Sequence, residues 1–366
     1  MGQRSDAIKK DFPIFAAYPK LVYLDNASTT QTPQVVLDAM NNYYTKYRAN
    51  IHRGVYKLSG EATEMYEGAR QVAADFLGAR FEEIVFTSGA TQGLNMLAQS
   101  LCSQIWVGSP GETPRVKPGD NVVLSRMEHH ANLIPWVEMS RRYGFEVRWI
   151  ELTSDFRLQT SDLPIDEQTK IVSFTLVSNT LGTINPAKEI IARAKKVGAT
   201  TIVDAAQAVA HMLIDVRRLD VDFLVFSGHK MYGPTGIGVL YGKKERLEMI
   251  DPAFFGGDMI KEVTFEKATW NDFPWKFEAG TPNIAGAIGL AAAIQYLERI
   301  GWQDILEHEA GILIYTLQEL QKIEGLNMIG PSFDFSPYQG ERGGVFEATQ
   351  ISAKKELLEN LAQGIK

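Results

Sequence analysis

Lys230 lies in a setting that is unusual for a surface lysine. Residues 226–238 read FSGHKMYGPTGIG, so this lysine follows an apolar run and precedes a stretch rich in glycine. A lysine that leaves a buried strand into a stiff loop is either a capped surface group or a nucleophile held in one position. Other polar residues of the sequence decide between these two interpretations.

Residues 86–95, FTSGATQGLN, form a candidate anion-binding turn. An apolar run passes into Ser-Gly-Ala-Thr and then into a helical pattern, so backbone N–H groups and the helix dipole would favour a phosphate there. Thr91 could add a hydroxyl donor. The segment matches neither the glycine-rich dinucleotide turn nor the P-loop, and a plain helix N-cap is the alternative.

Asp204 is a candidate because it ends an apolar run, in TTIVDAAQAVAHM, with Gln207 three residues later. An ionised carboxylate at such a position is unfavourable unless it has a partner. The carboxyl ends of strands are also where α/β folds bind their ligands. A helix N-cap is again the alternative.

The histidines and the cysteine argue against a metal site. His129 and His130 are adjacent, and adjacent side chains of an extended chain point in opposite directions. We therefore expect one of them to face a ligand and no shared metal ion. The sequence has no HExxH motif, and Cys102, its only cysteine, lies among leucines in a helical pattern. Such a cysteine is expected to fill the core rather than to react.

Taken together, these groups match the needs of pyridoxal 5′-phosphate. Its phosphate needs a helix N-terminus, its pyridine nitrogen a carboxylate, its aldehyde a lysine, and its ring a flat partner such as an imidazole. A phosphate-binding α/β module without covalent chemistry is the alternative. That alternative leaves the SGHK segment unexplained.

The elements that would position these groups alternate along the chain. Apolar runs of strand length are separated by helical patterns, which indicates an α/β fold with a mainly parallel sheet. The expected strands are 83–87, 121–125, 146–150, 170–177, 200–205, 223–227 and 238–242, and the expected helices include 62–77, 135–143, 186–197 and two more after residue 284. We predict an N-terminal arm (1–19), a large cofactor-binding domain (20–283) and a small C-terminal lobe (284–366).

The composition of the 366 residues is that of an ordinary globular protein, with 45% hydrophobic residues and a formal charge of −7. The negative charge argues against nucleic acid as a partner. No apolar run is long enough to span a membrane, and the first residues contain no apolar leader. We therefore expect a cytoplasmic protein.

Several motifs resemble one enzyme family. The segments YLDNAST, NIHRGVYKLS, FTSGATQGLN, MEHHANLIPW, VSNTLGTINP, VDAAQAV, FSGHKMYGPTG and FEAGTPN occur in the order found in cysteine desulfurases of the class V aminotransferase fold. They look closest to the branch that includes selenocysteine lyase-like enzymes. The resemblance covers roughly residues 20–345. It implies the aspartate aminotransferase-like fold of pyridoxal-phosphate-dependent transferases, a homodimer, L-cysteine or L-selenocysteine as substrate, and a sulfur-acceptor protein as a further partner.

The resemblance also implies roles for individual residues. Lys230 would form the Schiff base, Asp204 would pair with the pyridinium nitrogen, and His129 would stack on the ring, so Lys230 and His129 are the expected catalytic residues. The other expected cofactor contacts are Gln207 at the ring hydroxyl, Asn179 beside the ring, Ala90 (threonine in many members), Thr91, Ser227 and His229 at the phosphate turn, and Thr281 from a partner subunit.

The sequence departs from this family near its C-terminus. The family carries an Arg-x-Gly-His-His-Cys stretch whose arginine binds the substrate carboxylate and whose cysteine accepts the sulfur. Here GERGGVF (340–346) resembles the approach to that stretch, but EATQISAKKELLENLAQGIK follows and contains no cysteine. We therefore expect a shortened C-terminal lobe and an impaired persulfide step. Another class V aminotransferase or lyase reaction, and a catalytically silent dimer partner, are the alternatives.

Overall fold

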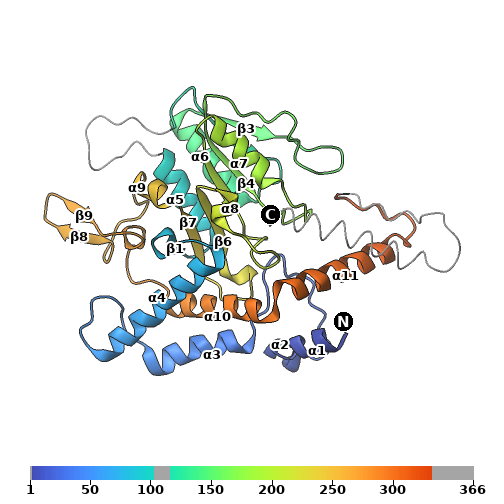
Figure 1. The fold of residues 1–366 in the computed structure, drawn as a ribbon, viewed down its shortest axis with the longest axis horizontal. Coiled ribbons are helices and arrows are strands. Elements are labelled where there is room, and N and C mark those ends of the chain that lie inside the picture. Colours follow the sequence, from blue (N-terminus) through green and yellow to red (C-terminus); the bar gives the residue numbers. More distant parts are fainter. Residues whose placement is uncertain (1, 103–115, 332–366) are drawn as a thin grey trace.

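The computed structural model describes residues 2–102 and 116–331. Within these ranges a seven-stranded sheet lies between layers of helices, and a two-stranded hairpin projects from one side of the molecule (Figure 1). The strands of the large sheet are β1 (Ile84–Thr87), β2 (Asn121–Ser125), β3 (Glu146–Ile150), β4 (Thr169–Thr175), β5 (Thr200–Asp204), β6 (Phe223–Ser227) and β7 (Gly238–Gly242). The hairpin consists of β8 (Ile260–Val263) and β9 (Ala268–Trp270).

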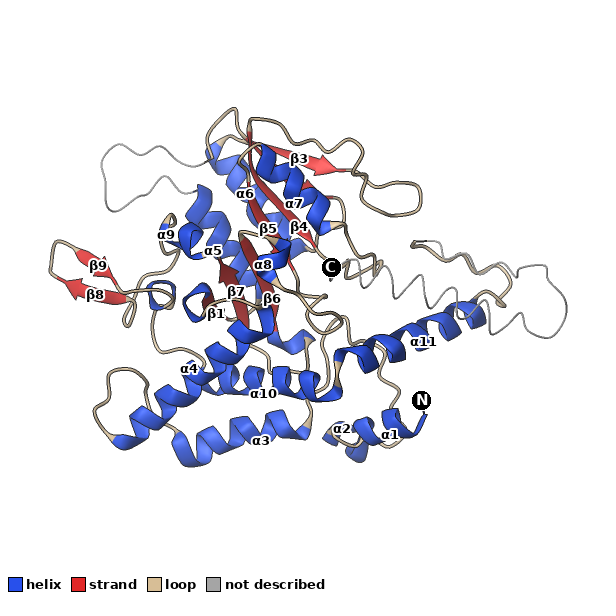
Figure 2. Cartoon of the chain, viewed as in Figure 1, coloured by secondary structure: helices blue, strands red, loops and turns tan. Residues whose placement is uncertain are grey.

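Helices cover the sheet on both faces (Figure 2). The helices are α1 (Gly2–Lys9), α2 (Pro13–Ala17), α3 (Gln34–Asn42), α4 (Lys57–Leu77), α5 (Ala90–Cys102), α6 (His130–Tyr143), α7 (Ala187–Lys196), α8 (Val216–Leu219), α9 (Lys244–Glu248), α10 (Ile284–Ile300) and α11 (Trp302–Leu320). Single turns of 3₁₀-helix lie at Phe81–Glu83, Gly228–Lys230 and Trp275–Phe277, and a π-helical turn follows α3 at Tyr43–Tyr47.

The sheet has the strand order β1-β7-β6-β5-β4-β2-β3. Parallel pairing joins β6, β5, β4, β2 and β3, whereas β7 is antiparallel to both of its neighbours, β6 and β1. The predicted α/β fold with a mainly parallel sheet is therefore confirmed. Each predicted strand is found within two residues of its expected bounds.

Alternate residues of each strand enter two hydrophobic clusters, one on each face of the sheet. Val123 and Val172 belong to the cluster that includes α4, α7 and α10, whereas their neighbours Val122 and Ile171 belong to the cluster of α5 and α6. Strands that are buried on both faces carry continuous apolar runs. This burial explains why the sequence shows these strands so clearly.

Two predicted helices begin earlier than expected. The helix predicted at 62–77 starts at Lys57, because its first turn carries polar residues and a glycine that hide the apolar pattern. The helix predicted at 135–143 starts at His130, and Pro135 lies inside it rather than at its first position. The earlier start makes His129 the N-cap residue of α6, with consequences for the site described below.

The N-terminal arm packs against α10 and the end of the lysine loop. The Phe12 ring lies 5.6 Å from the ring of Tyr232 and 6.0 Å from that of Tyr296, measured between centroids. Helix α10 shares its hydrophobic cluster with α4, so the division at residue 284 remains a prediction. The predicted loss of the cysteine-containing stretch concerns residues 340–366, which lie outside the described residues. In the described ranges, no helix combines the length and the apolar character needed to cross a bilayer.

Candidate active site

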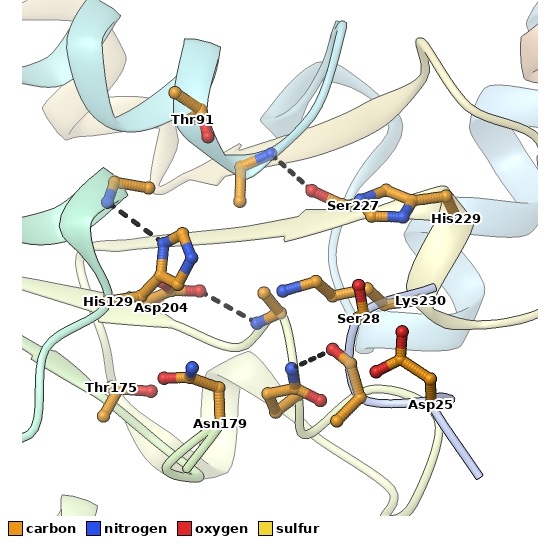
Figure 3. Close-up of a pocket in the computed structure, with 15 residues that line it drawn as sticks. Asp25, Ser28, Thr91, His129, Thr175, Asn179, Asp204, Ser227, His229 and Lys230 are labelled. Carbon is orange, nitrogen blue, oxygen red and sulfur yellow. Dashed lines mark hydrogen bonds between the residues drawn. The ribbon is translucent and has the colours of Figure 1, made fainter. Parts of the chain in front are cut away.

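A cavity of about 450 Å³ opens at the carboxyl edge of the parallel strands (Figure 3). Strands β4, β5 and β6 end there at Thr175, Asp204 and Ser227, and each of these residues lines the cavity. Nine of the ten predicted site residues line it: Ala90, Thr91, His129, Asn179, Asp204, Gln207, Ser227, His229 and Lys230. The structure thus brings together residues from segments that are far apart in the sequence.

The loop that carries Lys230 is fixed by contacts on both sides. The backbone oxygen of His229 accepts hydrogen bonds from the Thr30 N–H at 2.9 Å and the Thr30 hydroxyl at 3.0 Å. A Cβ atom at Gly233 would lie 2.9 Å from the Gly228 carbonyl oxygen, so this close approach requires glycine. The glycine-rich sequence therefore serves to hold the loop in one conformation.

The side chain of Lys230 is partly buried beside the cavity. Burial lowers the pKa of its amine, while the nearby charge of Asp204 acts in the opposite direction. A lowered pKa makes the unprotonated, nucleophilic amine more abundant at neutral pH. The geometry therefore favours the interpretation of Lys230 as a nucleophile over that of a capped surface group.

Asp204 is only 3% exposed and ends β5. Its carboxylate accepts a hydrogen bond from the Ala206 N–H at 2.9 Å. Burial raises the pKa of Asp204, although that hydrogen bond and the charge of Lys230 oppose the rise. No ion pair between Asp204 and a lysine or arginine is found in the described part of the chain, so a cationic ligand group would compensate its charge.

Ser227 connects the end of β6 to the start of α5. Its hydroxyl oxygen accepts a hydrogen bond from the Ala90 N–H at 2.8 Å. Thr91, in the first turn of α5, is exposed towards the cavity (Figure 3). His229 completes this end, with its Nδ1 3.2 Å from the Thr29 hydroxyl. Hydroxyl, imidazole and helix N-terminus together form the kind of surroundings that bind a phosphate group.

His129 faces the cavity and is held by the helix that it caps. Its Nδ1 accepts a hydrogen bond from the Ala131 N–H at 3.1 Å, so the neutral ring carries its proton on Nε2. Burial and the charge of Lys230 lower the pKa of His129, whereas the charge of Asp204 raises it. His130 does not line the cavity, which agrees with the expectation that one histidine of the pair faces a ligand.

The segment from residue 25 to 28 forms a wall that was not assigned a role from the sequence. Asp25, Ala27 and Ser28 line the cavity, and the Ala27 carbonyl oxygen accepts a hydrogen bond from the Gln207 side chain at 2.6 Å. These three residues belong to the YLDNAST motif, so the motif could have indicated from the sequence that this segment lies at the cavity. Gln207 is thereby fixed between this segment and the end of β5.

Thr281 and Cys102 lie away from the cavity. Thr281 is exposed and does not line it. Cys102 is fully buried in the cluster around α5, as predicted, and burial raises the pKa of its thiol to about 12. Among the residues that the structure describes, no group of three histidine, cysteine or acidic side chains could hold a metal ion.

Comparison with known proteins agrees with this geometry. Residues 22–336 match the aminotransferase class-V family. The chain is 48% identical over 335 residues to a probable cysteine desulfurase of Streptomyces coelicolor, covering 90% of this chain and 79% of that one. The structure of a cysteine desulfurase from Thermococcus onnurineus NA1 is similar with a TM-score of 0.78 at 41% identity, covering 86% and 77% of the two chains. The Escherichia coli cysteine desulfurase CsdA gives a TM-score of 0.79 at 32% identity, covering 98% and 97%. The chain therefore belongs to the aminotransferase class V family, in the group of the cysteine desulfurases.

Proposed function

We propose that the cavity binds pyridoxal 5′-phosphate and that the protein removes sulfur from L-cysteine or selenium from L-selenocysteine. The observation that carries this proposal is the meeting of a lysine amine, a buried carboxylate, an imidazole and a helix N-terminus at one cavity. These are the groups that the aldehyde, ring nitrogen, ring face and phosphate of the cofactor require. The cofactor, when bound, supplies an electron sink for bonds at the α-carbon of an amino acid.

Nine residues of the cavity have definite tasks in this proposal. Lys230 would attach the cofactor covalently and move a proton at the substrate α-carbon, since its amine pKa is already lowered by burial. Asp204 would keep a proton on the ring nitrogen, and His129 would lie against the ring face. Gln207 and Asn179 would contact the ring substituents, while Ala90, Thr91, Ser227 and His229 would surround the phosphate.

We also propose that the protein is a homodimer in which Thr281 of one subunit contacts the cofactor of the other. The exposure of this residue and its position outside the cavity of its own chain support a role in the site of a partner subunit. A Thr281→Ala variant should bind the cofactor more weakly without a change in its oligomeric state.

The fate of the sulfur depends on a thiol acceptor. The carbon–sulfur bond of the substrate breaks, alanine is released, and the sulfur passes to an acceptor thiolate as a persulfide. Cys102 is buried and its thiol is hard to ionise, so this cysteine cannot be the acceptor. We propose an external sulfur-acceptor protein. Without one, a thiol reductant such as dithiothreitol would have to supply the two electrons that slow release of the sulfur as sulfide requires. Location in the cytoplasm remains a prediction from the sequence.

Borohydride reduction followed by peptide mapping tests the cofactor assignment, and the label should lie on Lys230. Incubation with L-cysteine, L-selenocysteine and L-alanine, each with dithiothreitol as reductant, then separates the candidate activities by assay of sulfide, selenide, alanine and keto acids. We expect weak sulfide release and stronger selenide release, because selenium leaves more readily. Keto-acid formation would indicate another class V reaction, and cofactor binding without any product would indicate a silent partner.

A further inference from the structure

Glu128, the residue before His129, makes a set of contacts that the proposed chemistry does not use. Its carboxylate accepts hydrogen bonds from the Thr175 N–H at 3.0 Å, from the Asn132 side-chain amide at 2.6 Å, and from the Ser125 hydroxyl. Ser125, Asn132 and Thr175 are all buried, with exposures of 1%, 0% and 5%. The residue as a whole is partly exposed, so its carboxylate is the part directed into the interior.

These contacts cross-link three elements beside the cavity. Ser125 ends β2, Asn132 lies in the first turn of α6, and Thr175 ends β4. The Asn132 oxygen in turn accepts hydrogen bonds from the Trp136 indole at 3.0 Å and from the Ser173 hydroxyl at 2.6 Å. Glu128 therefore fastens the start of α6 to the end of β4 through a continuous chain of polar contacts.

The two ends of this chain of contacts are residues that line the cavity. His129 caps α6 directly after Glu128, and Thr175 is aligned with Asp204 in the pairing of β4 with β5. The Glu128 carboxylate is thus a short link between the turn that carries the imidazole and the strand position next to the buried carboxylate. Burial raises the pKa of Glu128 to about 8, and the charge of Asp204 adds to the rise.

We propose that Glu128 is a positioning residue that sets the placement of the His129 imidazole relative to Asp204. A carboxyl group can bond to all three partners whether it is ionised or protonated, because a protonated oxygen can donate to the Ser125 hydroxyl and still accept from the Thr175 N–H. The NH2 of an amide of the same shape cannot accept a hydrogen bond. In Glu128→Gln, the amide NH2 must face either the Thr175 N–H or the Asn132 NH2, so one link is lost. Only the identity of the ligand rests on the function proposed above; the placement of His129 does not.

Glu128→Gln tests this proposal, with Glu138→Gln as the matched control. Glu138 lies on α6, the helix that His129 caps, and its side chain is 52% exposed in an ion pair with Arg141. In protein without cofactor, the carbon-13 signal of the His129 imidazole, assigned with His129→Asn, should shift or broaden in Glu128→Gln. The control should leave all six histidine signals in place. Ser125→Ala removes one donor to the carboxylate and should shift the His129 signal less.

Loading with pyridoxal 5′-phosphate gives a second measurement. We expect Glu128→Gln to weaken cofactor binding by about tenfold, as the loss of one buried hydrogen bond would. The visible circular dichroism per bound cofactor should fall at least about twofold, because the ring is held less rigidly. If Glu128→Gln and Ser125→Ala lower only the melting temperature, and leave the His129 signal and the circular dichroism unchanged, the proposal is wrong. If wild-type protein binds no cofactor, the proposed function fails, and the His129 signal still decides the role of Glu128.

Discussion

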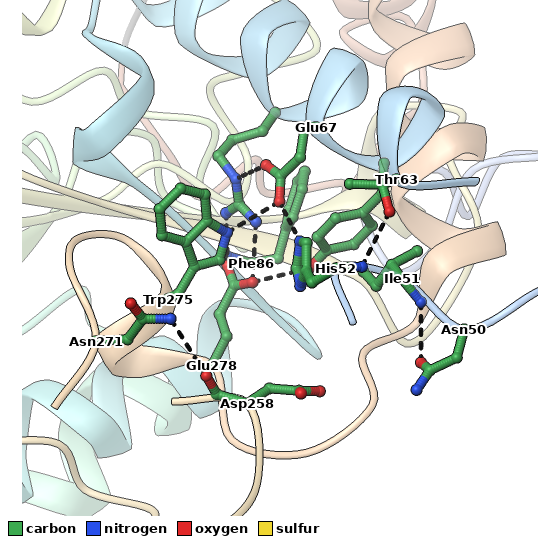
Figure 4. A network of polar contacts seen from close by, with 12 residues as sticks. Asn50, Ile51, His52, Thr63, Glu67, Phe86, Asp258, Asn271, Trp275 and Glu278 are labelled. Carbon is green, nitrogen blue, oxygen red and sulfur yellow. Dashed lines mark hydrogen bonds and ion pairs between the residues drawn. The ribbon is translucent and has the colours of Figure 1, made fainter. Parts of the chain in front are cut away.

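Two groups of inward-facing carboxylates in this protein differ in what neutralises them. The Arg70 cluster consists of Glu67, Arg70 and Glu278 and lies between α4, β1 and the turn that precedes α10 (Figure 4). In the second group, Asp204 lines the cavity, and Glu128 is hydrogen-bonded to Thr175, which also lines it. The first group contains its own permanent cation. In residues 2–102 and 116–331, neither Asp204 nor Glu128 forms an ion pair with a lysine or an arginine.

Arg70 is fully buried and donates four hydrogen bonds. Its guanidinium donates to both oxygens of Glu278 at 2.6 and 2.9 Å, to Glu67 at 2.7 Å, and to the Ile84 carbonyl oxygen at 2.9 Å. The charge of Glu278 raises the pKa of Arg70 although burial opposes it. Bidentate pairs of this kind are strong and fix geometry.

The pKa values of Glu67 and Glu128 move in opposite directions. Burial alone would raise the pKa of Glu67, but the hydrogen bond from His52 and the charge of Arg70 lower it to about 2. Glu128 has only uncharged donors, and burial raises its pKa to about 8. A carboxylate with its own guanidinium stabilises the fold, whereas one without it is available to a proton or to a cationic ligand.

Removal of the guanidinium should have the largest effect. Arg70→Met leaves Glu67 and Glu278 in place without their cation, so we expect a loss of about 3–5 kcal/mol in the free energy of unfolding. Arg141→Met is the matched control, since Arg141 also pairs with an acidic residue three positions earlier but is 74% exposed. The control should change stability by no more than about 0.5 kcal/mol. Similar values for both variants in urea unfolding would contradict the distinction drawn here.

Replacement of the cavity carboxylate should leave stability intact and change function. Asp204→Asn keeps the acceptor for the Ala206 N–H and removes a charge that burial disfavours, so the unfolding free energy should not fall. Exchange of the α-proton of bound L-alanine in deuterated water should slow about ten- to hundredfold, the loss expected for one hydrogen bond to a charged group. Asp155→Asn, on an exposed loop, serves as control. Normal exchange in Asp204→Asn would disprove the role of this carboxylate.

The pH dependence of stability should separate the two groups by sign. Glu67 has a folded-state pKa of about 2, below its ordinary value of 4.5. The free energy of unfolding therefore falls as the pH drops from about 4.5 to 2, because Glu67 takes up a proton more readily in the unfolded chain. Glu128 holds its proton up to about pH 8, so stability falls as the pH rises from about 4.5 to 8. In urea unfolding across this range, Glu67→Gln should flatten the acid side and Glu128→Gln the alkaline side. An effect of both variants on the same side would count against this assignment.

Cys102 lies outside both groups, and its replacement should have the smallest effect. Its thiol has a pKa raised to about 12 by burial, so Cys102→Ser should leave sulfide and selenide release unchanged. After incubation with L-cysteine, the mass of the intact protein should show no persulfide. A persulfide on Cys102, or loss of activity in Cys102→Ser, would show that this cysteine reacts.

The sequence indicated the cavity well because its residues lie at the ends of strands. Lys230, Asp204 and Ser227 follow or end continuous apolar runs, so local pattern alone indicated where they would meet. The Arg70 cluster gave no such signal, because Arg70 and Glu278 are 208 positions apart and meet only through packing. Glu128 was not predicted as a site residue for a related reason. Its role depends on a contact with Thr175, 47 positions later in the sequence.

Elements with weak apolar patterns were also missed. The β8–β9 hairpin is largely exposed, with Phe265 and Val263 in contact with solvent, so it lacks the continuous apolar run that indicated the other strands. The start of α6 was also placed too late, at residue 135, although the helix begins at His130. That error hid the role of His129 as a helix cap.

The antiparallel pairing of β6 with β7 has a consequence for the order of folding. Ser227 is paired with Gly238, so the segment that carries Lys230 is closed by contacts between residues only eleven positions apart. The other walls of the cavity depend on parallel strands, whose pairing must wait for a crossover connection. Because short loops cost less entropy to close, we expect the lysine loop to form early and to resist local opening. Amide hydrogen exchange should accordingly be slower in β6 and β7 than at Asn179, on the turn that follows β4.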